Sequence, residues 1–380
     1  MSDWYRVIER RIQEFYESPE ELRDFVAYLK EKQDKFQYIC IWGVGNLGRP
    51  TAEAFKEHHL RVDFYCDNDS QKWGKEFDGI KCLSVDELSK IKDQTLVIIC
   101  ARAYKEIFRQ LNELGYPHLD RVFMNKFAIR EYLAECQKET VLEHIREVMD
   151  ICADGQSQKI LSKIILEWLD NESGDLDDIC TYDQYFCKDV LKLEDQEVFV
   201  DCGAYNGDTL QEFLKIKGDK FSKLILFELS ADNFGELEKN VSILDKSIKN
   251  KVEIHNKGVS DKKEKIVYFE QGEGSSAWGI SGNLELGGGS DGYLTTIDEE
   301  CKGNRITYIK MDIEGSEMAA LKGAEQCIRI DKPKLAVCLY HKPQDIWELP
   351  LYIKKILPEY HIYIRHHTDL LNETVCYAVI

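Results

Sequence analysis

The feature that most constrains the fold is a pattern that occurs twice: an apolar strand ends in a glycine turn that opens a helix. The first copy is the strand Tyr38–Trp42 with the turn Gly43–Gly48. The second is the strand Glu197–Cys202 with the turn Gly203–Gly207. Further apolar strands follow each copy and are separated by stretches of helical periodicity. This alternation implies parallel sheets covered by helices, so the sequence predicts an α/β protein with two such sheets.

The predicted elements divide the 380-residue chain into four parts. Residues 1–35 form N-terminal helices, residues 36–125 a Rossmann-like domain, residues 126–195 a helical connector and residues 196–380 a second, longer Rossmann-like domain. In the first domain, strands Val62–Cys66 and Leu96–Cys100 complete a β-α-β pattern. The second domain has seven strands, of which the last two form an antiparallel pair at a sheet edge. After Glu197–Cys202 its strands are Lys223–Phe227, Val252–His255, Ile306–Met311, Lys334–Tyr340, Tyr360–Arg365 and Thr374–Ile380.

Composition narrows the class of protein. Apolar residues make up 43% and charged residues 31% of the chain, which is typical of a soluble globular protein. The net charge of −19 argues against a nucleic-acid partner, because binding to phosphates relies on Lys and Arg. The 13 cysteines include no C-x-x-C pair, which predicts buried free thiols in a reducing compartment. No segment resembles a membrane span or a secretion signal, so we expect a cytoplasmic protein.

A Gly/Ser-rich stretch, Gln271–Gly292, interrupts the second domain after an expected extra strand at Ile266–Phe269. So many glycines cannot pack a core, and loops of this kind often carry function. We therefore expect a mobile loop at a functional edge. In it, Ser275, Ser276 and Trp278 are expected to contact a substrate, with the Trp278 ring available for stacking.

The turn of the second domain has the pattern D-x-G-x-x-x-G, from Asp201 through Gly203 to Gly207, and a helix begins near Asp208. Glycines there let the backbone approach a ligand at the carboxyl end of a parallel strand, where such folds bind nucleotides. An acid, Glu228, ends the next strand, where a carboxylate can accept both ribose hydroxyls. The expected cofactor-binding residues of this region are Asp201, Gly203, Ala204, Tyr205, Gly207, Asp208, Thr209 and Glu228.

Two structural alternatives remain open for this pattern. The turn can be a simple strand-to-helix connection, and Glu228 can merely cap the next turn. The segment has no G-x-G-x-x-G phosphate cradle, so a ligand with ribose and adenine but no pyrophosphate fits better than NAD. S-adenosylmethionine is such a ligand.

A third motif, Lys310-Met311-Asp312-Ile313-Glu314-Gly315-Ser316-Glu317, resembles the hallmark of the FkbM family of methyltransferases. Phe199–Ala204 and Phe227-Glu228 fit the same family's pattern, and the resemblance runs from about Glu197 to Ile380. It implies a seven-stranded class I methyltransferase sheet that transfers a methyl group from S-adenosylmethionine, usually to oxygen of a sugar, glycolipid or secondary metabolite.

The resemblance also adds residues to the expected site. Asp312 and Glu314 join the cofactor-binding set. Tyr185-Phe186 resembles a segment that packs over the cofactor in this family, with a plain core contact as the alternative. One departure concerns Glu228, which precedes Leu229 where family members often have proline.

Transfer to a sugar hydroxyl needs a base or a metal, because such a hydroxyl is a poor acid. We take His341 as the base, with Asp312 and His366 as further catalytic candidates. As alternatives, His341 can satisfy a backbone carbonyl, Asp312 can anchor its loop, and His366 or His367 is expected at the surface. Asp312, Glu314, His341 and His366 could also form a metal site with mixed oxygen and nitrogen ligands.

The turn of the first domain has the form of a phosphate cradle, with Gly43, Gly45, Asn46 and Gly48, and Asp67 ends the next strand. On mechanism alone NAD is the default ligand. The segment Tyr38–Phe123, however, is similar to small Rossmann-like domains attached to bacterial sugar-modifying enzymes. That similarity implies nucleotide-sugar binding or scaffolding, and an empty docking unit is the alternative.

The leading hypothesis is an S-adenosylmethionine-dependent O-methyltransferase acting on a hydroxyl of a nucleotide-linked or glycan-bound sugar in carbohydrate biosynthesis. The first rival is an NAD-dependent oxidoreductase using the first domain, which lacks a recognisable hydride-transfer partner. The second rival is a non-catalytic nucleotide-binding protein. Three motifs at three strand ends of the second domain speak against it.

Overall fold

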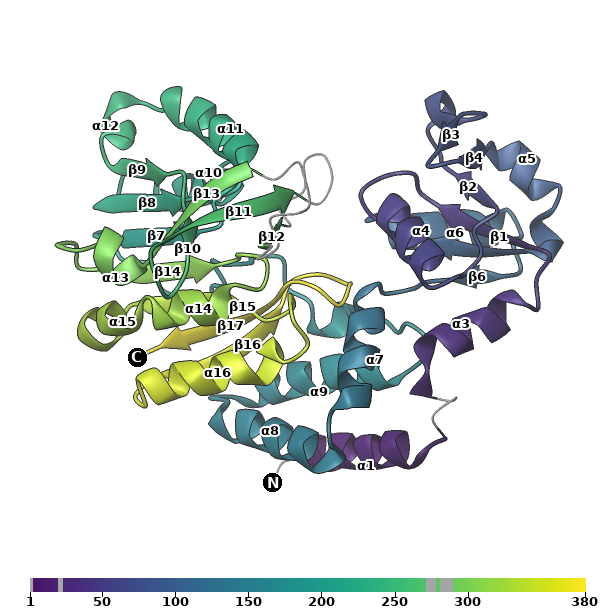
Figure 1. The fold of residues 1–380 in the computed structure, drawn as a ribbon, viewed down its shortest axis with the longest axis horizontal. Helices are drawn as coiled ribbons and strands as arrows, with labels where there is room; N and C mark the ends of the chain where they lie inside the picture. Colours follow the sequence, from purple (N-terminus) through teal and green to yellow (C-terminus); the bar gives the residue numbers. More distant parts are fainter. Residues whose placement is uncertain (1–2, 20–22, 271–277, 281–289) are drawn as a thin grey trace. The chain divides into compact units, whose positions relative to one another are not determined.

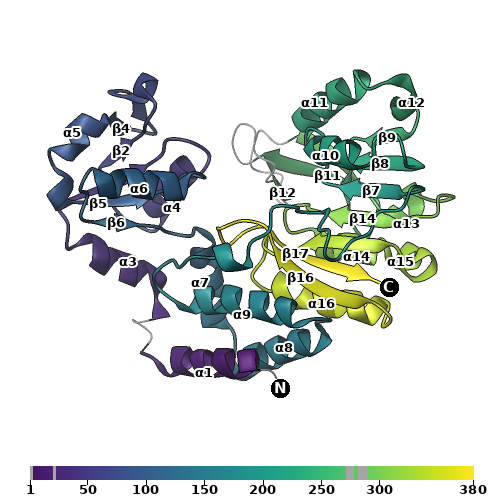
Figure 2. The same ribbon diagram turned by 180° about the vertical axis from the view of Figure 1, so that it is seen from behind.

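The computed structural model describes residues 3–19, 23–270, 278–280 and 290–380. The chain divides into two compact units: unit 1 holds residues 1–142 and 162–175, and unit 2 holds residues 143–161 and 176–380. Helices α8 (Lys138–Ile151) and α9 (Gly155–Leu169) contribute to both units. The predicted α/β class with two sheets is confirmed (Figures 1 and 2). Among these residues, no helix has the length and apolar character needed to cross a membrane.

Unit 1 is built on a six-stranded sheet in the order β3-β4-β2-β1-β5-β6. Its strands run parallel except β3, which is antiparallel to β4 at the edge. The strands are β1 (Tyr38–Trp42), β2 (Phe64–Cys66), β3 (Glu76–Phe77), β4 (Ile80–Leu83), β5 (Thr95–Ile99) and β6 (Leu119–Asp120). The helices are α1 (Asp3–Glu17), α3 (Phe25–Gln33), α4 (Gly48–Glu57), α5 (Val85–Ser89), α6 (Tyr104–Glu113) and α7 (Asn125–Glu135), with short 3-10 turns at Ser70–Lys72 and Lys92–Gln94.

The central strand β1 is buried on both faces, which explains its uninterrupted apolar sequence. Ile41 packs in one cluster with Phe55 of α4, whereas Trp42 packs in another with Leu111 of α6. Helices α4 and α6 accordingly lie on opposite faces of the sheet (Figures 1 and 2).

Unit 2 is built on a seven-stranded sheet in the order β16-β17-β15-β14-β7-β8-β9. Its strands run parallel except β17, which is antiparallel to both of its neighbours. The strands are β7 (Val198–Cys202), β8 (Lys223–Phe227), β9 (Val252–His255), β14 (Tyr308–Met311), β15 (Lys334–Cys338), β16 (His361–His366) and β17 (Thr374–Val379). The helices are α10 (Asp208–Lys217), α11 (Ala231–Ser242), α12 (Lys246–Lys249), α13 (Ile297–Glu300), α14 (Glu317–Lys322), α15 (Glu325–Asp331) and α16 (Asp345–Ile356).

The strand order of unit 2 reverses at β7. The chain passes from β7 outward to β8 and β9, and then returns to β14 on the other side of β7. In open α/β sheets, ligands bind outside the carboxyl ends of the strands at such a point. The predicted antiparallel pair at the end of the chain is confirmed, and the predicted strand ends differ from the observed ones by a residue or two.

A four-stranded sheet follows β9, in the order β10-β13-β11-β12. It consists of β10 (Gly258–Val259), β11 (Glu264–Glu270), β12 (Trp278–Ile280) and β13 (Ser290–Thr295). The predicted extra strand is confirmed as part of β11. The predicted loop Gln271–Gly292 is wrong where β12 and the first residues of β13 pair with β11 in antiparallel fashion. Ser275 and Ser276 lie outside the described residues.

The predicted connector is less helical than expected. Helices α7, α8 and α9 fill its first part, but after Leu169 the described chain reaches β7 with one short 3-10 turn, Asp177–Ile179. Within unit 2 this segment is held by strand-like contacts instead. Cys180 pairs with His366, and the amide of Thr181 donates to the carbonyl of His366 (2.8 Å).

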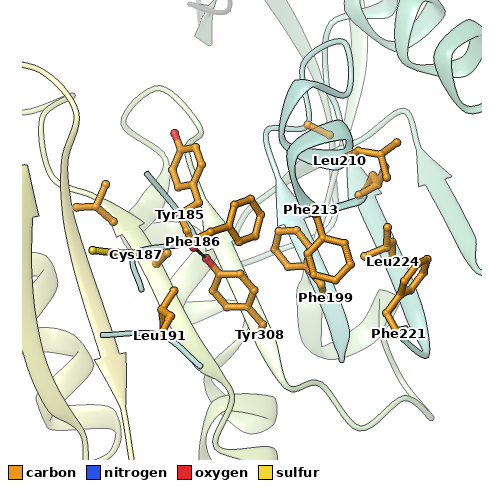
Figure 3. Close-up of a cluster of buried hydrophobic side chains, with 14 of the residues drawn as sticks. Tyr185, Phe186, Cys187, Leu191, Phe199, Leu210, Phe213, Phe221, Leu224 and Tyr308 are labelled. Carbon is orange, nitrogen blue, oxygen red and sulfur yellow. Dashed lines mark hydrogen bonds between the residues drawn. The ribbon is translucent and has the colours of Figure 1, made fainter. Parts of the chain in front are cut away.

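Aromatic side chains fill the core of unit 2 between β7, β14, α10 and the segment that precedes β7 (Figure 3). Phe199 of β7 stacks on Tyr308 of β14, with 4.6 Å between ring centroids. Phe186 meets Phe199 edge-on at 6.1 Å, a favoured aromatic geometry. The segment before β7 is therefore anchored beside the two central strands.

Gly292 explains how a glycine-rich stretch can still pack in a sheet. It is buried in β13, and an ideal Cβ there would lie 2.9 Å from both Leu229 Cδ1 and Tyr268 Cδ1. Leu229 and Tyr268 belong to a small apolar cluster under this sheet. The missing side chain thus leaves the space that these two larger side chains fill.

We expect Gly292→Ala to lower the free energy of unfolding by about 1–3 kcal/mol, because the added methyl group overpacks this cluster. Urea denaturation measures the change. Gly235→Ala in α11 is the matched control, since a Cβ there meets nothing within 4 Å, and it should leave the protein as stable or more so. Equal effects of the two substitutions would contradict the packing argument.

Candidate active site

Two loops meet at the carboxyl ends of β7 and β14, in the middle of the unit 2 sheet. Gly203 in the first loop has a φ of +89°, and an ideal Cβ there would lie 1.9 Å from the carbonyl oxygen of Asp312 in the second. The amide of Asp312 donates to the carbonyl of Cys202 (3.0 Å). Glycine is therefore required at position 203 for both its conformation and the approach of the second loop.

The rest of the first loop is also tightly turned. Tyr205 and Gly207 have φ values of +47° and +91°, and Gly207 is the N-cap of α10. A Cβ at Gly207 would lie 3.0 Å from Leu237 Cδ1. Asp208 then begins the helix and accepts a hydrogen bond from the amide of Thr209 (2.7 Å), which places an acidic group at the positive end of the helix dipole.

Asp201 and Lys310 form a buried ion pair beneath the first loop. Lys310 Nζ lies 3.0 Å from Asp201 Oδ1 and donates to the carbonyl of Gly203 (2.7 Å). The Asp201 side chain is 0% exposed and the Lys310 side chain 2% exposed. Burial raises the pKa of Asp201 to about 6, against the opposing effect of Lys310. Despite burial, the charges of Asp201 and Asp312 hold the pKa of Lys310 above its usual range. Asp201 thus supports the loop from below.

Glu228, at the end of β8, joins that strand to the first loop. Its Oε2 accepts from the amide of Tyr205 (2.9 Å), and its Oε1 accepts from the amide of Ser230 (2.8 Å). The neighbouring amide of Ala204 donates to the carbonyl of Phe227 (2.9 Å). Burial raises the pKa of Glu228 to about 7. The carboxyl group therefore lies at the first loop, as its proposed role requires, and it also caps the next turn.

Asp312 lies on the opposite side of the first loop, after β14. Its Oδ2 accepts from the hydroxyl of Tyr185 (2.7 Å), and its Oδ1 accepts from the hydroxyl of Tyr340 (3.0 Å). Although burial opposes it, the charges of Lys310 and His341 and the two hydroxyl groups hold the pKa of Asp312 below its usual value. Asp312 is therefore an ionised, oriented carboxylate, and a quarter of its side chain stays exposed.

His341, after β15, is surrounded by carboxylates. Its Nδ1 lies 2.8 Å from Glu317 Oε1, and its Nε2 lies 3.3 Å from Asp312 Oδ1 and 3.5 Å from Glu314 Oε2. Burial alone would lower the pKa of His341, but the hydrogen bond to Glu317 and the charges of all three acids raise it to about 9. The imidazole is thus a cation near neutral pH. Carboxylates hold this ring, so the alternative of a bond to a backbone carbonyl is wrong.

His366 and His367 are both buried, so the expectation that one of them lies at the surface is wrong. The ring of His366 bonds to the hydroxyl of Thr374 and the carbonyl of Leu370, both at 2.8 Å. The ring of His367 bonds to the hydroxyls of Thr181 (3.0 Å) and Tyr377 (2.8 Å). Burial lowers the pKa of each to about 4, so both rings are neutral.

The structure does not bring together the metal-ligand set that the sequence allowed. Asp312, Glu314 and His341 are neighbours, but both ring nitrogens of His366 are bonded elsewhere. Across the part of the chain that the structure describes, no group of three or more His, Cys, Asp and Glu side chains is arranged to hold a metal ion.

Tyr185 and Phe186 play different parts. Phe186 is a core residue, as the structural alternative predicted. Tyr185 has a φ of +64°, and its amide donates to the hydroxyl of Tyr377 (3.0 Å) while its carbonyl accepts from the hydroxyl of Tyr308 (Figure 3). A left-handed conformation at a bulky residue persists only where the surroundings enforce it, and these contacts aim the Tyr185 hydroxyl at Asp312.

The glycine turn of unit 1 is equally compact. A Cβ at Gly43 would lie 2.5 Å from the carbonyl oxygen of Cys100, and one at Gly48 would lie 1.8 Å from that of Gly43. Asp67 Oδ2 accepts from the amide of Val44 (2.8 Å) and from Lys72 Nζ (2.8 Å).

The remaining residues predicted for that turn are less constrained. An ideal Cβ added at Gly45 would meet nothing within 4 Å, and Asn46 is exposed. Against burial, Lys72 and the bonded amides hold the pKa of Asp67 below its usual value. Asp67 thus has a lysine partner. Among the described residues, Glu228 of unit 2 has no lysine in its hydrogen bonds or ion pairs.

Sequence reasoning missed several residues of the unit 2 site. Lys310 and Glu317 stood inside the quoted motif, and their spacing from Asp312 was the available signal. Tyr340 precedes His341 and could have been found in the same way. Glu373 had no signal: it follows the last turn before β17 and bonds to Gln184, a contact between distant segments.

Comparison with known proteins agrees with this geometry. Residues 201–367 match the family model of the methyltransferase FkbM domain. This part of the chain is an FkbM methyltransferase domain. Residues 36–122, in unit 1, match a second family model, described as C2185-like, N-terminal. A search of curated proteins finds no match to the chain.

One solved structure supports the fold of both units. The crystal structure of methyltransferase FkbM from Methylobacillus flagellatus KT is 21% identical, with 99% of each chain covered and a TM-score of 0.71. An rRNA methylase from Streptococcus thermophilus is 14% identical over 49% of this chain and 87% of its own, with a TM-score of 0.31, which is too low to add to the argument. The first likeness shows a shared fold over the whole length.

We expect Lys310→Met in the methyltransferase domain to lower the free energy of unfolding by about 3–5 kcal/mol, because it leaves Asp201 buried without its partner. Urea denaturation measures the loss. Adding Asp201→Asn should restore part of it, since the uncompensated charge is then gone. Lys265→Met is the control: its pair with Asp291 is exposed, so the change should stay within about 1 kcal/mol. No recovery in the double variant would contradict the ion-pair account.

Proposed function

We propose that the protein is an S-adenosylmethionine-dependent O-methyltransferase that acts on a hydroxyl of a sugar, nucleotide-linked or part of a glycan. The observation that carries the proposal is the convergence of the glycine loop, Glu228 and Asp312 at the point where the unit 2 sheet reverses its strand order. Membership of residues 201–367 in the FkbM methyltransferase family supports the reaction class.

The residues at this point fit an adenosyl ligand better than a dinucleotide. The loop Gly203–Gly207 offers its backbone and no G-x-G-x-x-G cradle, and the nearby cation Lys310 is engaged below it by Asp201 and by a carbonyl. Lys310 is thus not available to pair with a pyrophosphate, whereas Glu228 can accept bonds from ribose hydroxyls. In the proposal Glu228 and the loop hold the adenosine part, and S-adenosylmethionine supplies the methyl group.

The acceptor side has the groups that a hydroxyl acceptor needs. Asp312 and Glu314 offer carboxylate oxygens that can bind a hydroxyl, and His341 is the proposed base. Positioning supplies most of the rate in such a transfer. The choice of a sugar rests on the family resemblance and on the sequence resemblance of Tyr38–Phe123 to small domains attached to sugar-modifying enzymes. A role in cytoplasmic glycan biosynthesis would follow from that choice.

S-adenosylhomocysteine should stabilise the protein in a thermal-shift measurement, by about 2.7 kcal/mol at a hundredfold excess over Kd, and NAD should not. Glu228→Ala should abolish the shift, because the ribose hydroxyls lose their acceptor. Glu238→Ala, on the exposed face of α11, is the matched control and should keep the full shift. Stabilisation by NAD with none by S-adenosylhomocysteine would overturn the proposed function.

Turnover should rise with pH if His341 is the base. With a pKa of about 9, roughly 1% of the imidazole is neutral near pH 7, and only that neutral fraction can take a proton. Methyl transfer from radiolabelled S-adenosylmethionine to a panel of sugars and glycans, followed from about pH 6.5 to 9.5, should therefore increase about tenfold per pH unit below the pKa.

Glu317→Gln tests the same assignment from the other direction. Removing this carboxylate removes the strongest contribution that raises the pKa of His341, so the pH profile should move to lower pH. His341→Ala should leave S-adenosylhomocysteine binding intact while lowering turnover. A flat profile together with unchanged turnover in His341→Ala would remove His341 as the base.

A further inference from the structure

The order of strands in the unit 2 sheet places Glu228 and Asp312 on opposite sides of the glycine loop. Glu228 follows β8 on one side of β7, and Asp312 follows β14 on the other side. The glycine loop after β7 lies between them and touches both: Tyr205 donates to Glu228, and Gly203 approaches the Asp312 carbonyl. If the ribose lies at Glu228, as the proposed function requires, this order places Asp312 where the sulfonium-bearing chain of the cofactor can reach it across β7.

The two ends of this path differ in charge. At the Glu228 end, burial raises the pKa of the carboxyl group to about 7, so only about half of the Glu228 carboxyl groups are ionised near pH 7. At the Asp312 end, two tyrosine hydroxyls and nearby cations keep the carboxylate ionised. The negative charge of the path is thus concentrated on the β14 side.

The cations near Asp312 are already engaged. Lys310 is paired with Asp201 at 3.0 Å, and His341 is paired with Glu317 at 2.8 Å. The acids around Asp312 and His341 are Glu314 in the same loop, and Glu317, Asp345 and Glu373 from neighbouring elements. His341 also lies 3.3 Å from Asp312 and 3.5 Å from Glu314, and Lys342 donates to the carbonyl of Gly315 beside them. The carboxyl groups of this region still outnumber its cations, and about a quarter of the Asp312 and Glu314 side chains is exposed.

We propose that Asp312, held by Tyr185 and Tyr340, is the residue that recognises the positive charge of the cofactor, so that the site binds a cationic adenosyl ligand more tightly than a neutral one. This inference rests on the proposed function. S-adenosylmethionine carries a sulfonium, whereas S-adenosylhomocysteine carries an uncharged thioether. An ionised carboxylate that is partly buried attracts the first and has no comparable attraction for the second.

The charge preference has a consequence for turnover. When the methyl group moves to the acceptor oxygen, the carbon–sulfur bond breaks with its electrons left on sulfur, and the acceptor hydroxyl loses its proton to the base. The product cofactor is then neutral. Asp312 holds the substrate form and loses its attraction for the product form, which favours release after the reaction.

Calorimetric titration with two stable ligands tests the proposal. Sinefungin carries an ammonium where S-adenosylmethionine carries its sulfonium, and S-adenosylhomocysteine is neutral there. The wild-type protein should bind sinefungin about tenfold more tightly. In Asp312→Asn the ratio of the two Kd values should fall to near one, with the S-adenosylhomocysteine Kd changed by no more than about threefold. If the substitution instead unfolded the protein, the binding of both ligands would weaken together and the ratio of the two Kd values would stay unchanged.

Two further variants keep the test decisive. Tyr340→Phe removes one hydroxyl from Asp312 and should reduce the ratio by a smaller factor, even where Asp312→Asn fails to fold. Asp291→Asn, an exposed carboxylate-to-amide change in β13, should leave the ratio at its wild-type value. Equal affinities in the wild type, or an unchanged ratio in a folded Asp312→Asn, would overturn the inference. Binding of neither ligand would instead overturn the proposed function.

Discussion

The buried pair of Asp201 and Lys310 is the interaction on which the rest of the site depends. The two residues are direct partners in the register of β7 and β14, so their side chains leave the same face of the sheet at the same level. Either charge alone would be costly in this environment. Together they fix the two central strands, and the hydrogen bond from Lys310 to the Gly203 carbonyl ties the loop above to this pair. The close approach of Gly203 to Asp312 then follows from the register.

Charge is distributed unevenly above this pair. Glu228 is buried against backbone amides and has a pKa near neutrality, whereas Asp312 receives two hydroxyl groups and stays ionised. His341 is cationic because three carboxylates surround it. The single buried acid on one side of the loop is therefore only partly ionised near pH 7, while the acids and the cation on the other side stay charged. This asymmetry comes from the partners that each side offers: backbone amides of Tyr205 and Ser230 bond to Glu228, whereas side chains surround Asp312 and His341.

Much of the fold could be predicted from the sequence, because strands buried on both faces and glycine turns leave strong local patterns. The motif around Lys310 and Glu317 likewise located the second loop. What failed depends on contacts between distant segments. His366 and His367 looked polar enough for the surface, but the chain around Thr181 and the strand carrying Tyr377 cover them and bond to the His367 ring. Gly292 looked like loop sequence because its reason, the space taken by Tyr268 and Leu229, is not local.

The two glycine turns show why a motif alone does not decide function. The turn of unit 1 looks more like a nucleotide motif, yet its acid, Asp67, is neutralised by Lys72 and bonded to the amide of Val44. The turn of unit 2 has fewer glycines, but Glu228 is bonded to backbone amides and meets a second loop that carries Asp312 on the far side. In both turns, glycines allow the chain to pass sharply from a strand into a helix. The two turns differ in the partner of the acid. In unit 1, Lys72 neutralises the charge of Asp67. In unit 2, backbone amides orient the Glu228 carboxyl group and no lysine among the described residues is paired with it.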